Sequence, residues 1–214
     1  MKVCVKIIIS VLILCMVFLS GCAGRNLPSL LNGDNICFPG VEWFCSPEEL
    51  FDALNLTEDD ITAEEDANTY RLITKNVKLF GNEEGIVFTF VREGEGSLVL
   101  INIRVLYDES VDMAEIREKV ENSLGPPQEE PGGKMDLQLT TNDELTELER
   151  SELSGHIVLW NSKTTISYPD KSQILPATNL VWSDDQRVWL LGSAEANIPK
   201  AGVLFFSAAY IPGD

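Results

Sequence analysis

The sequence predicts an α+β fold in which two principal helices pack against antiparallel sheet. Three observations predict it: two capped segments with helical periodicity, several segments in which apolar and polar residues alternate, and turn residues between those segments. Alternation places the apolar side chains of a strand on one face, as in antiparallel sheets with one buried side. We therefore expect the helices to cover the apolar face of the sheet.

Two helices are expected from their start and stop signals. Ser46, Pro47 and Glu49 have the pattern of an N-cap, a proline in the first turn and a capping box. A second helix is expected from about Val111 to Leu124, where apolar residues recur at spacings of three and four. Gly125 and the prolines after it end that helix.

Strands are expected wherever the period changes to two. The segment 97–107 should place the apolar residues 99, 101, 103 and 105 on one face. Segment 178–182 should pair with 187–192 across a turn at Ser183–Gln186, and the nearly unbroken apolar segment from Gly202 should be covered on both faces. The expected strands are 70–81, 85–91, 97–107, 155–160, 164–168, 178–182, 187–192 and 202–211.

The first 22 residues resemble a bacterial lipoprotein signal. Two lysines precede an apolar run from Ile7 to Leu19, which is shorter than the about 20 residues of a membrane span. The segment Leu19-Ser20-Gly21-Cys22 resembles a lipobox, which implies that the Cys22 thiol receives a diacylglyceryl group and that the chain is cut before it. The resemblance implies a protein on the outer face of a bacterial membrane. The alternative is a leader with a chance cysteine.

This organisation predicts a signal peptide at 1–21, a tether at 22–36 and a single α+β domain at 37–214. The net charge is −18, and loss of the two leader lysines would make it −20. Nucleic acid needs clustered Lys and Arg, and so does a body lying flat on anionic lipid, so the charge argues against both. We expect the domain to stand off the membrane on a diacylglyceryl anchor.

Two cysteines remain in the expected domain, Cys37 and Cys45. Outside the cytoplasm such a pair is a disulfide candidate, and the turn signal Pro39-Gly40 lies between them. Closing this loop would stabilise by about 2 to 3 kcal/mol on the chain-entropy model. The alternative is two buried reduced thiols.

Few residues point to catalysis or to a cofactor. His156 is the only histidine and has no recognisable nucleophile beside it, so it is expected to be structural or on the surface. The acidic segment 57–66 lacks the ligand spacing of a calcium loop and is expected to be a solvated turn. We expect neither a metal nor another cofactor.

Trp160, Trp182 and Trp189 are the candidate binding residues, because exposed tryptophans dominate binding hot spots. As an aromatic patch they would bind a wall glycan or a partner protein, and the alternative is that they fill the core.

Residues 47–127 carry a second resemblance. A capped helix, strands containing Leu79-Phe80-Gly81 and Gly85 to Phe90, and a helix ending at Gly125-Pro126 resemble the small α+β units of envelope lipoproteins related to β-lactamase inhibitor protein and outer-membrane-assembly lipoproteins. That resemblance implies protein binding or scaffolding without enzymatic activity. The alternative is a carboxylate-dependent hydrolase, or a binding module, that acts on a cell-wall or surface glycan.

Overall fold

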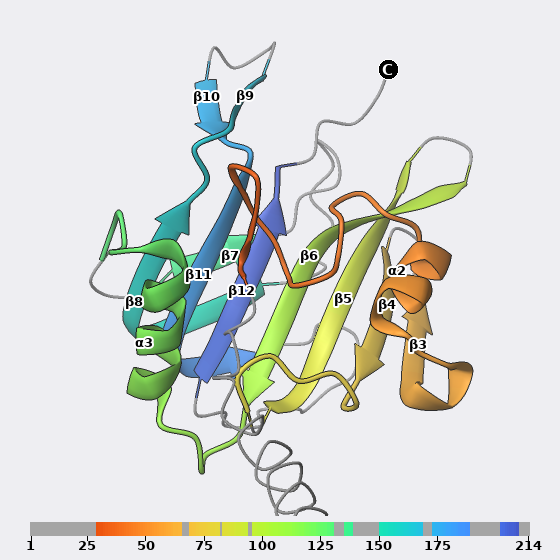
Figure 1. The fold of residues 1–214 in the computed structure, drawn as a ribbon, viewed down its shortest axis with the longest axis horizontal. Helices are drawn as coiled ribbons and strands as arrows, with labels where there is room; N and C mark the ends of the chain where they lie inside the picture. Colours follow the sequence, from red (N-terminus) through yellow and green to blue (C-terminus); the bar gives the residue numbers. More distant parts are fainter. Residues whose placement is uncertain are drawn as a thin grey trace, which may run out of the picture.

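The computed structural model describes residues 29–65, 69–81, 83–93, 96–130, 135–138, 150–168, 173–188 and 202–209. In these residues two helices accompany antiparallel sheets, so the predicted α+β fold class is confirmed (Figure 1).

The main sheet has eight strands in the order β3-β4-β5-β6-β12-β11-β8-β7. Every neighbouring pair is antiparallel. The strand β12, which comes last in the chain, lies between β6 and β11 and joins the two halves of the sheet. The strands are β3 (Ile61–Glu65), β4 (Thr69–Thr74), β5 (Glu83–Glu93), β6 (Ser97–Tyr107), β7 (Met135–Gln138), β8 (Arg150–Asn161), β11 (Thr178–Val188) and β12 (Gly202–Ala208).

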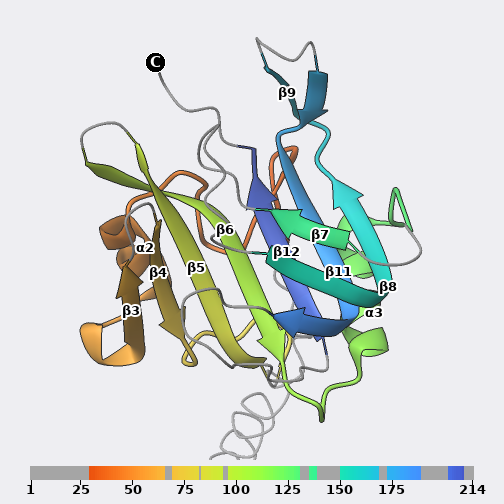
Figure 2. The same cartoon turned by 180° about the vertical axis from the view of Figure 1, so that it is seen from behind.

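Two small hairpins lie outside this sheet. One pairs β1 (Leu31–Asn32) with β2 (Asn35–Ile36), and the other pairs β9 (Thr165–Tyr168) with β10 (Gln173–Pro176). The β9–β10 hairpin projects beyond the end of β8 and β11 in both views (Figures 1 and 2).

Each helix begins after an N-cap residue, and α2 begins where its capping residues predict. In α2 (Pro47–Leu54) the Ser46 hydroxyl accepts from the Glu49 N–H at 3.3 Å, and the Glu49 carboxylate accepts from the Ser46 N–H at 2.8 Å. In α3 (Met113–Leu124) the Asp112 carboxylate accepts from the Ala114 N–H, so this helix begins two residues later than expected. A short 3₁₀ helix, η2 (Glu58–Asp60), follows α2.

The main core lies between the helices and one face of the sheet. Phe88 and Phe206 in the sheet are fully buried, and both meet the edge of Phe38, with ring centroids 5.9 and 6.0 Å apart. Leu30 and Ile36 belong to the same core. The folded domain therefore begins before residue 37, inside the segment expected to be tether.

A bulge in β6 changes which of its side chains face the main core. Thr89 pairs with Asn102 and Phe90 pairs with Leu100, which leaves Ile101 as an extra residue. Residues 100, 103 and 105 consequently lie in the main core, whereas Val99 and Ile101 pack with Val91 in a separate cluster. The prediction that 99, 101, 103 and 105 share one face is wrong, because a bulge shifts the alternation by one residue.

The turn expected at Ser183–Gln186 is also wrong. The strand β11 runs through these residues with only a bulge between Ser183 and Asp185. It stays extended because β8 pairs with it on both sides of the bulge, as far as Val188, while β12 pairs with it as far as Ser183. Segment 178–182 therefore pairs with those strands and not with 187–192.

A row of polar residues crosses the face of the sheet that points away from the main core. Asn102 donates its amide to the Phe206 carbonyl at 3.1 Å, and the Ser207 hydroxyl donates to Asn179 at 2.6 Å. A slip of one residue would turn such side chains into the apolar core, so this row disfavours other registers. The residues in register are Arg71, Thr89, Asn102, Ser207, Asn179 and Asn161.

Candidate functional site

Two of the three tryptophans predicted to bind a ligand are buried beside α3. Trp160 is 0% exposed and donates its indole N–H to the Gly125 carbonyl at 2.9 Å. Trp182 is 3% exposed and donates to the Met113 carbonyl at 3.0 Å. The predicted aromatic patch is therefore wrong for these two residues, which hold both ends of the helix on the sheet. Trp189 lies outside the described residues.

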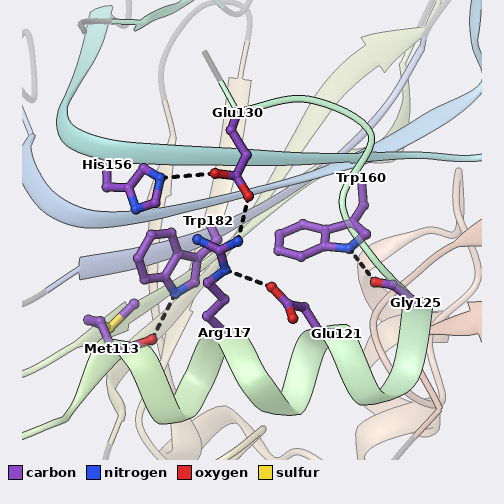
Figure 3. A network of polar contacts seen from close by, with 8 residues as sticks. All are labelled: Met113, Arg117, Glu121, Gly125, Glu130, His156, Trp160 and Trp182. Atoms are coloured by element: carbon purple, nitrogen blue, oxygen red, sulfur yellow. Dashed lines mark hydrogen bonds and ion pairs between the residues drawn. The ribbon is translucent and has the colours of Figure 1, made fainter. Parts of the chain in front are cut away.

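A charged network lies against Trp182 (Figure 3). The Arg117 guanidinium lies over the Trp182 ring, 5.9 Å from its centroid, and donates to Glu121 at 2.7 Å and to Glu130 at 2.5 Å. His156 Nε2 lies 3.3 Å from the other oxygen of Glu130, and the His156 ring meets Trp182 edge-on at 5.8 Å.

The hydrogen bonds of this network favour the ionised forms of Glu130 and Arg117. The hydrogen bond from Arg117 is the main cause that lowers the pKa of Glu130, and the bond to Glu121 is the main cause that raises the pKa of Arg117. Both partners of Arg117 are more than one-third exposed at their side chains, so solvent screens these ion pairs and each contributes little to stability.

His156 contacts acidic and aromatic groups in this network. The His156 backbone N–H donates to Asp184 at 2.7 Å, and its ring contacts Glu130 and Trp182. With the exposed carboxylates around it, this network forms a charged contact surface over α3.

Cys37 and Cys45 are both free and buried, so the structure contains the two reduced thiols of the alternative and not the predicted disulfide. Burial is the main cause that raises the pKa of each thiol to about 11, with Glu42 adding to the effect at Cys37 and Glu49 at Cys45. A raised pKa disfavours the thiolate, which is the reactive form. Neither thiol has the environment of a catalytic cysteine.

A shallow depression of about 350 Å³ lies beside Cys37, on the β1–β2 hairpin. The carboxylate of Glu42 in its wall already accepts two hydrogen bonds from the Asn32 amide, at 2.9 and 3.0 Å. The depression has no second charged residue in its lining, which consists of Ser29, Leu31, Asn32, Cys37, Pro39, Gly40, Val41 and Glu42. It lacks the converging polar groups of a small-molecule site.

The acidic segment that follows α2 forms η2 and the edge strand β3 instead of a simple turn. Two hydrogen bonds from Thr57 are the main cause that lowers the pKa of Asp60, which also accepts from Asn76. Within the described ranges, no group of three or more His, Cys, Asp or Glu residues could hold a metal ion.

The β9–β10 hairpin carries the most exposed large apolar side chain described. Ile174 is 69% exposed and its neighbour Leu175 is 40% exposed. The base of this hairpin contacts the other one, because the Lys163 N–H donates to the Asp34 carbonyl at 3.3 Å. We call β1, β2, β9 and β10 together the two-hairpin end. Hydrophobic alternation did not predict this end of the domain, although the apolar pair Ile174-Leu175 stands between polar residues and Pro176.

The lipidation candidate Cys22 precedes the described residues, which begin at Ser29. Among the helices that are described, none is long and apolar enough to cross a membrane.

Comparison with known proteins adds no relative from which a role could be transferred: no family model, no curated protein and no solved structure matches this chain.

Proposed function

We propose that this chain is a lipid-anchored protein of the bacterial envelope that binds or scaffolds another extracytoplasmic protein and catalyses no reaction. The observation that carries the proposal is the segment Leu19-Ser20-Gly21-Cys22, which resembles a lipobox and lies shortly before a folded domain. Two acyl chains suffice for a stable anchor, so the domain needs no membrane-spanning helix.

The length of the tether supports a role close to the membrane. Leu30 is 0% exposed, and its N–H donates to the Ser123 hydroxyl of α3 at 3.0 Å. Leu30 follows Cys22 by eight residues, which reach at most about 29 Å when fully extended. A domain held this closely meets partners in or beside the same membrane.

The charge over α3 supports a protein partner with a basic surface. Glu115 and Glu118 are exposed on the helix, and Glu129 and Glu130 are exposed in the segment that follows. Arg117 is already engaged by Glu121 and Glu130, so the face presents mainly carboxylates. Complementary charge raises association rates and selects among partners.

The glycan-directed alternative has less support. As a glycan-binding module it relied on tryptophans at the surface, and Trp160 and Trp182 are both buried. As a carboxylate-dependent hydrolase it needs two close acidic side chains in a cleft, and the depression beside Cys37 is lined by one carboxylate, that of Glu42.

Crosslinking in intact cells tests the proposal. A photoreactive residue replaces exposed Glu118 on α3, with a matched probe at exposed Lys75 after β4, and crosslinked proteins are identified by mass spectrometry. We expect a reproducible partner from position 118 and not from 75, and its loss in the Cys22→Ser variant together with release of the protein from membranes. Retention of Cys22→Ser on membranes after a salt wash would refute the anchor, and the absence of any position-118 product would refute the protein-binding role.

A further inference from the structure

We infer that the β9–β10 hairpin contacts the outer surface of the lipid bilayer and thereby orients the anchored domain. The inference rests on the membrane location in the proposed function. It goes beyond that function because it assigns a second, apolar contact with the membrane to the β9–β10 hairpin, far in the sequence from the expected lipid anchor.

The hairpin presents apolar side chains that the domain does not cover. Ile174 is 69% exposed and Leu175 is 40% exposed. They are adjacent in β10 and so point to opposite faces of the hairpin. A two-stranded hairpin is marginally stable in water unless it packs against another surface. Each face of this hairpin has an exposed apolar side chain that could make such a contact.

The start of the folded domain lies at the base of the same hairpin. Asp34 in the turn between β1 and β2 accepts from the Lys163 N–H, and Lys163 lies two residues before β9. The Ile36 N–H donates to the Thr178 hydroxyl just after β10, at 2.8 Å. The tether from Cys22 thus enters the domain at the two-hairpin end, and the short reach to Leu30 keeps this end near the lipid.

Charge also favours this end as the one that meets the bilayer. The strand residues of β9 and β10 include no charged side chain, whereas the chain has a net charge of −18. The exposed acids of η2 and β3 lie at the opposite edge of the sheet, which keeps them away from an anionic surface (Figure 1). The segment between the two strands contains one acidic and one basic residue, Asp170 and Lys171, so the hairpin has no net charge. The acidic domain therefore does not lie flat on lipid but meets it through a projection without net charge.

Two side chains offer too little apolar area to hold the domain on a bilayer without the anchor. The contact is accordingly an orienting one, which forms once a tether raises the local concentration of lipid.

The test uses the mature chain with a hexahistidine tag and Cys22→Ser at its N-terminus. The chain is tethered to vesicles of phosphatidylethanolamine and phosphatidylglycerol containing a nickel-chelating lipid. An environment-sensitive fluorophore is placed at Ile174→Cys, with Lys75→Cys as the matched control. Cys37 and Cys45 do not compete for the label because both are buried.

We expect the emission at position 174 to shift to the blue on tethering and to be quenched by spin-labelled lipid, with no change at position 75. Untagged chain mixed with the same vesicles should show no shift. An unchanged signal at 174 in the tethered chain would overturn the inference. A blue shift without vesicles that grows with protein concentration would overturn it in favour of self-association. A shift at 174 only when the crosslinked partner is added would overturn it in favour of a protein contact.

Since the tag replaces the natural lipid, this result is independent of whether Cys22 is acylated. Failure of the anchor in cells and failure of the hairpin contact on vesicles are thus distinguishable.

Discussion

Trp182 donates its indole N–H to the carbonyl oxygen of Met113 at 3.0 Å, and this bond ties β11 to the first residue of α3. Trp160 makes the equivalent bond to Gly125 directly after the other end of the helix. The helix is therefore pinned at both ends by side chains of neighbouring strands, and α3 presents its outer carboxylates on a rigid support.

The Trp182→Phe variant should be less stable than the wild type by about 1 to 2 kcal/mol, because a buried hydrogen bond and part of a packed ring are lost. Urea unfolding followed by circular dichroism measures the change. Trp43→Phe is the matched control, since Trp43 also donates to a backbone carbonyl, that of Ile36 at 2.7 Å, from a half-buried position. An unchanged free energy of unfolding in Trp182→Phe would contradict the role of Trp182 in holding α3 on the sheet.

Gly202→Ala should destabilise the domain by about 2 kcal/mol or more, because an added methyl group overpacks the start of β12. A Cβ at this position would lie 2.3 Å from the Ser183 carbonyl oxygen and 2.6 Å from Met113 Cε. The Ser183 oxygen belongs to the backbone of β11 and cannot move aside alone. Chemical denaturation gives the loss of free energy.

Gly85→Ala is the control for that substitution. Its Cβ would meet the Thr74 carbonyl oxygen at 3.7 Å, which is ordinary van der Waals contact. A loss at Gly202 no larger than that at Gly85 would mean that β11 and α3 adjust to the methyl group.

Glu83→Ala should cost about 2 to 3 kcal/mol, because hydrogen bonds to a charged acceptor are strong and their donors would be left without it. One carboxylate oxygen of Glu83 accepts from three successive backbone N–H groups, those of residues 79, 80 and 81, at 2.7, 2.6 and 3.0 Å. The measurement is the midpoint of thermal unfolding.

Glu83→Gln keeps an acceptor oxygen and should lose less than Glu83→Ala. Half-exposed Lys78 lies 3.7 Å from the buried carboxylate of Glu83 and donates to the Glu83 carbonyl at 2.6 Å, so Lys78→Met should destabilise the domain, but less than Glu83→Ala, which removes the acceptor of three backbone N–H groups. Equal losses in Glu83→Ala and Lys78→Met would assign the stabilisation to the ion pair instead.

The two buried thiols predict a decline in stability at alkaline pH. Because burial raises the pKa of Cys37 and Cys45 to about 11, the folded state favours the protonated thiol. Their contribution is fully present below the ordinary thiol pKa of about 8.5 and is lost as the pH rises toward about 11. Urea unfolding across this range should show a flatter pH dependence for the double variant Cys37→Ala and Cys45→Ala than for the wild type.

A thiol count distinguishes this state from the disulfide. Both cysteines should react with a thiol reagent in protein unfolded without reductant, and should react slowly in the native protein because the thiolate is the reactive form. A count of zero in the unfolded, unreduced protein would mean that the disulfide forms.

Local sequence was sufficient for the helices and for several strands. Ser46, Glu49 and Gly125 act within one turn of the helices that they bound, and β6 covers the residues that alternation predicts. Capping and alternation are short-range effects, so they can be read without knowing the rest of the chain. The resemblance of Leu19-Ser20-Gly21-Cys22 to a lipobox is equally local, and lipidation of Cys22 stays a prediction.

Tertiary contacts decided the features that the local pattern did not contain. The expected turn at Ser183–Gln186 is part of β11 because β8 supplies backbone partners, and the bulge at Ile101 turns part of β6 over because β5 and β6 pair around one extra residue. Trp160 and Trp182 became helix supports because α3 covers them. Strand pairing and burial outweigh local conformational preference, because together they form many backbone hydrogen bonds and remove large apolar surfaces from water.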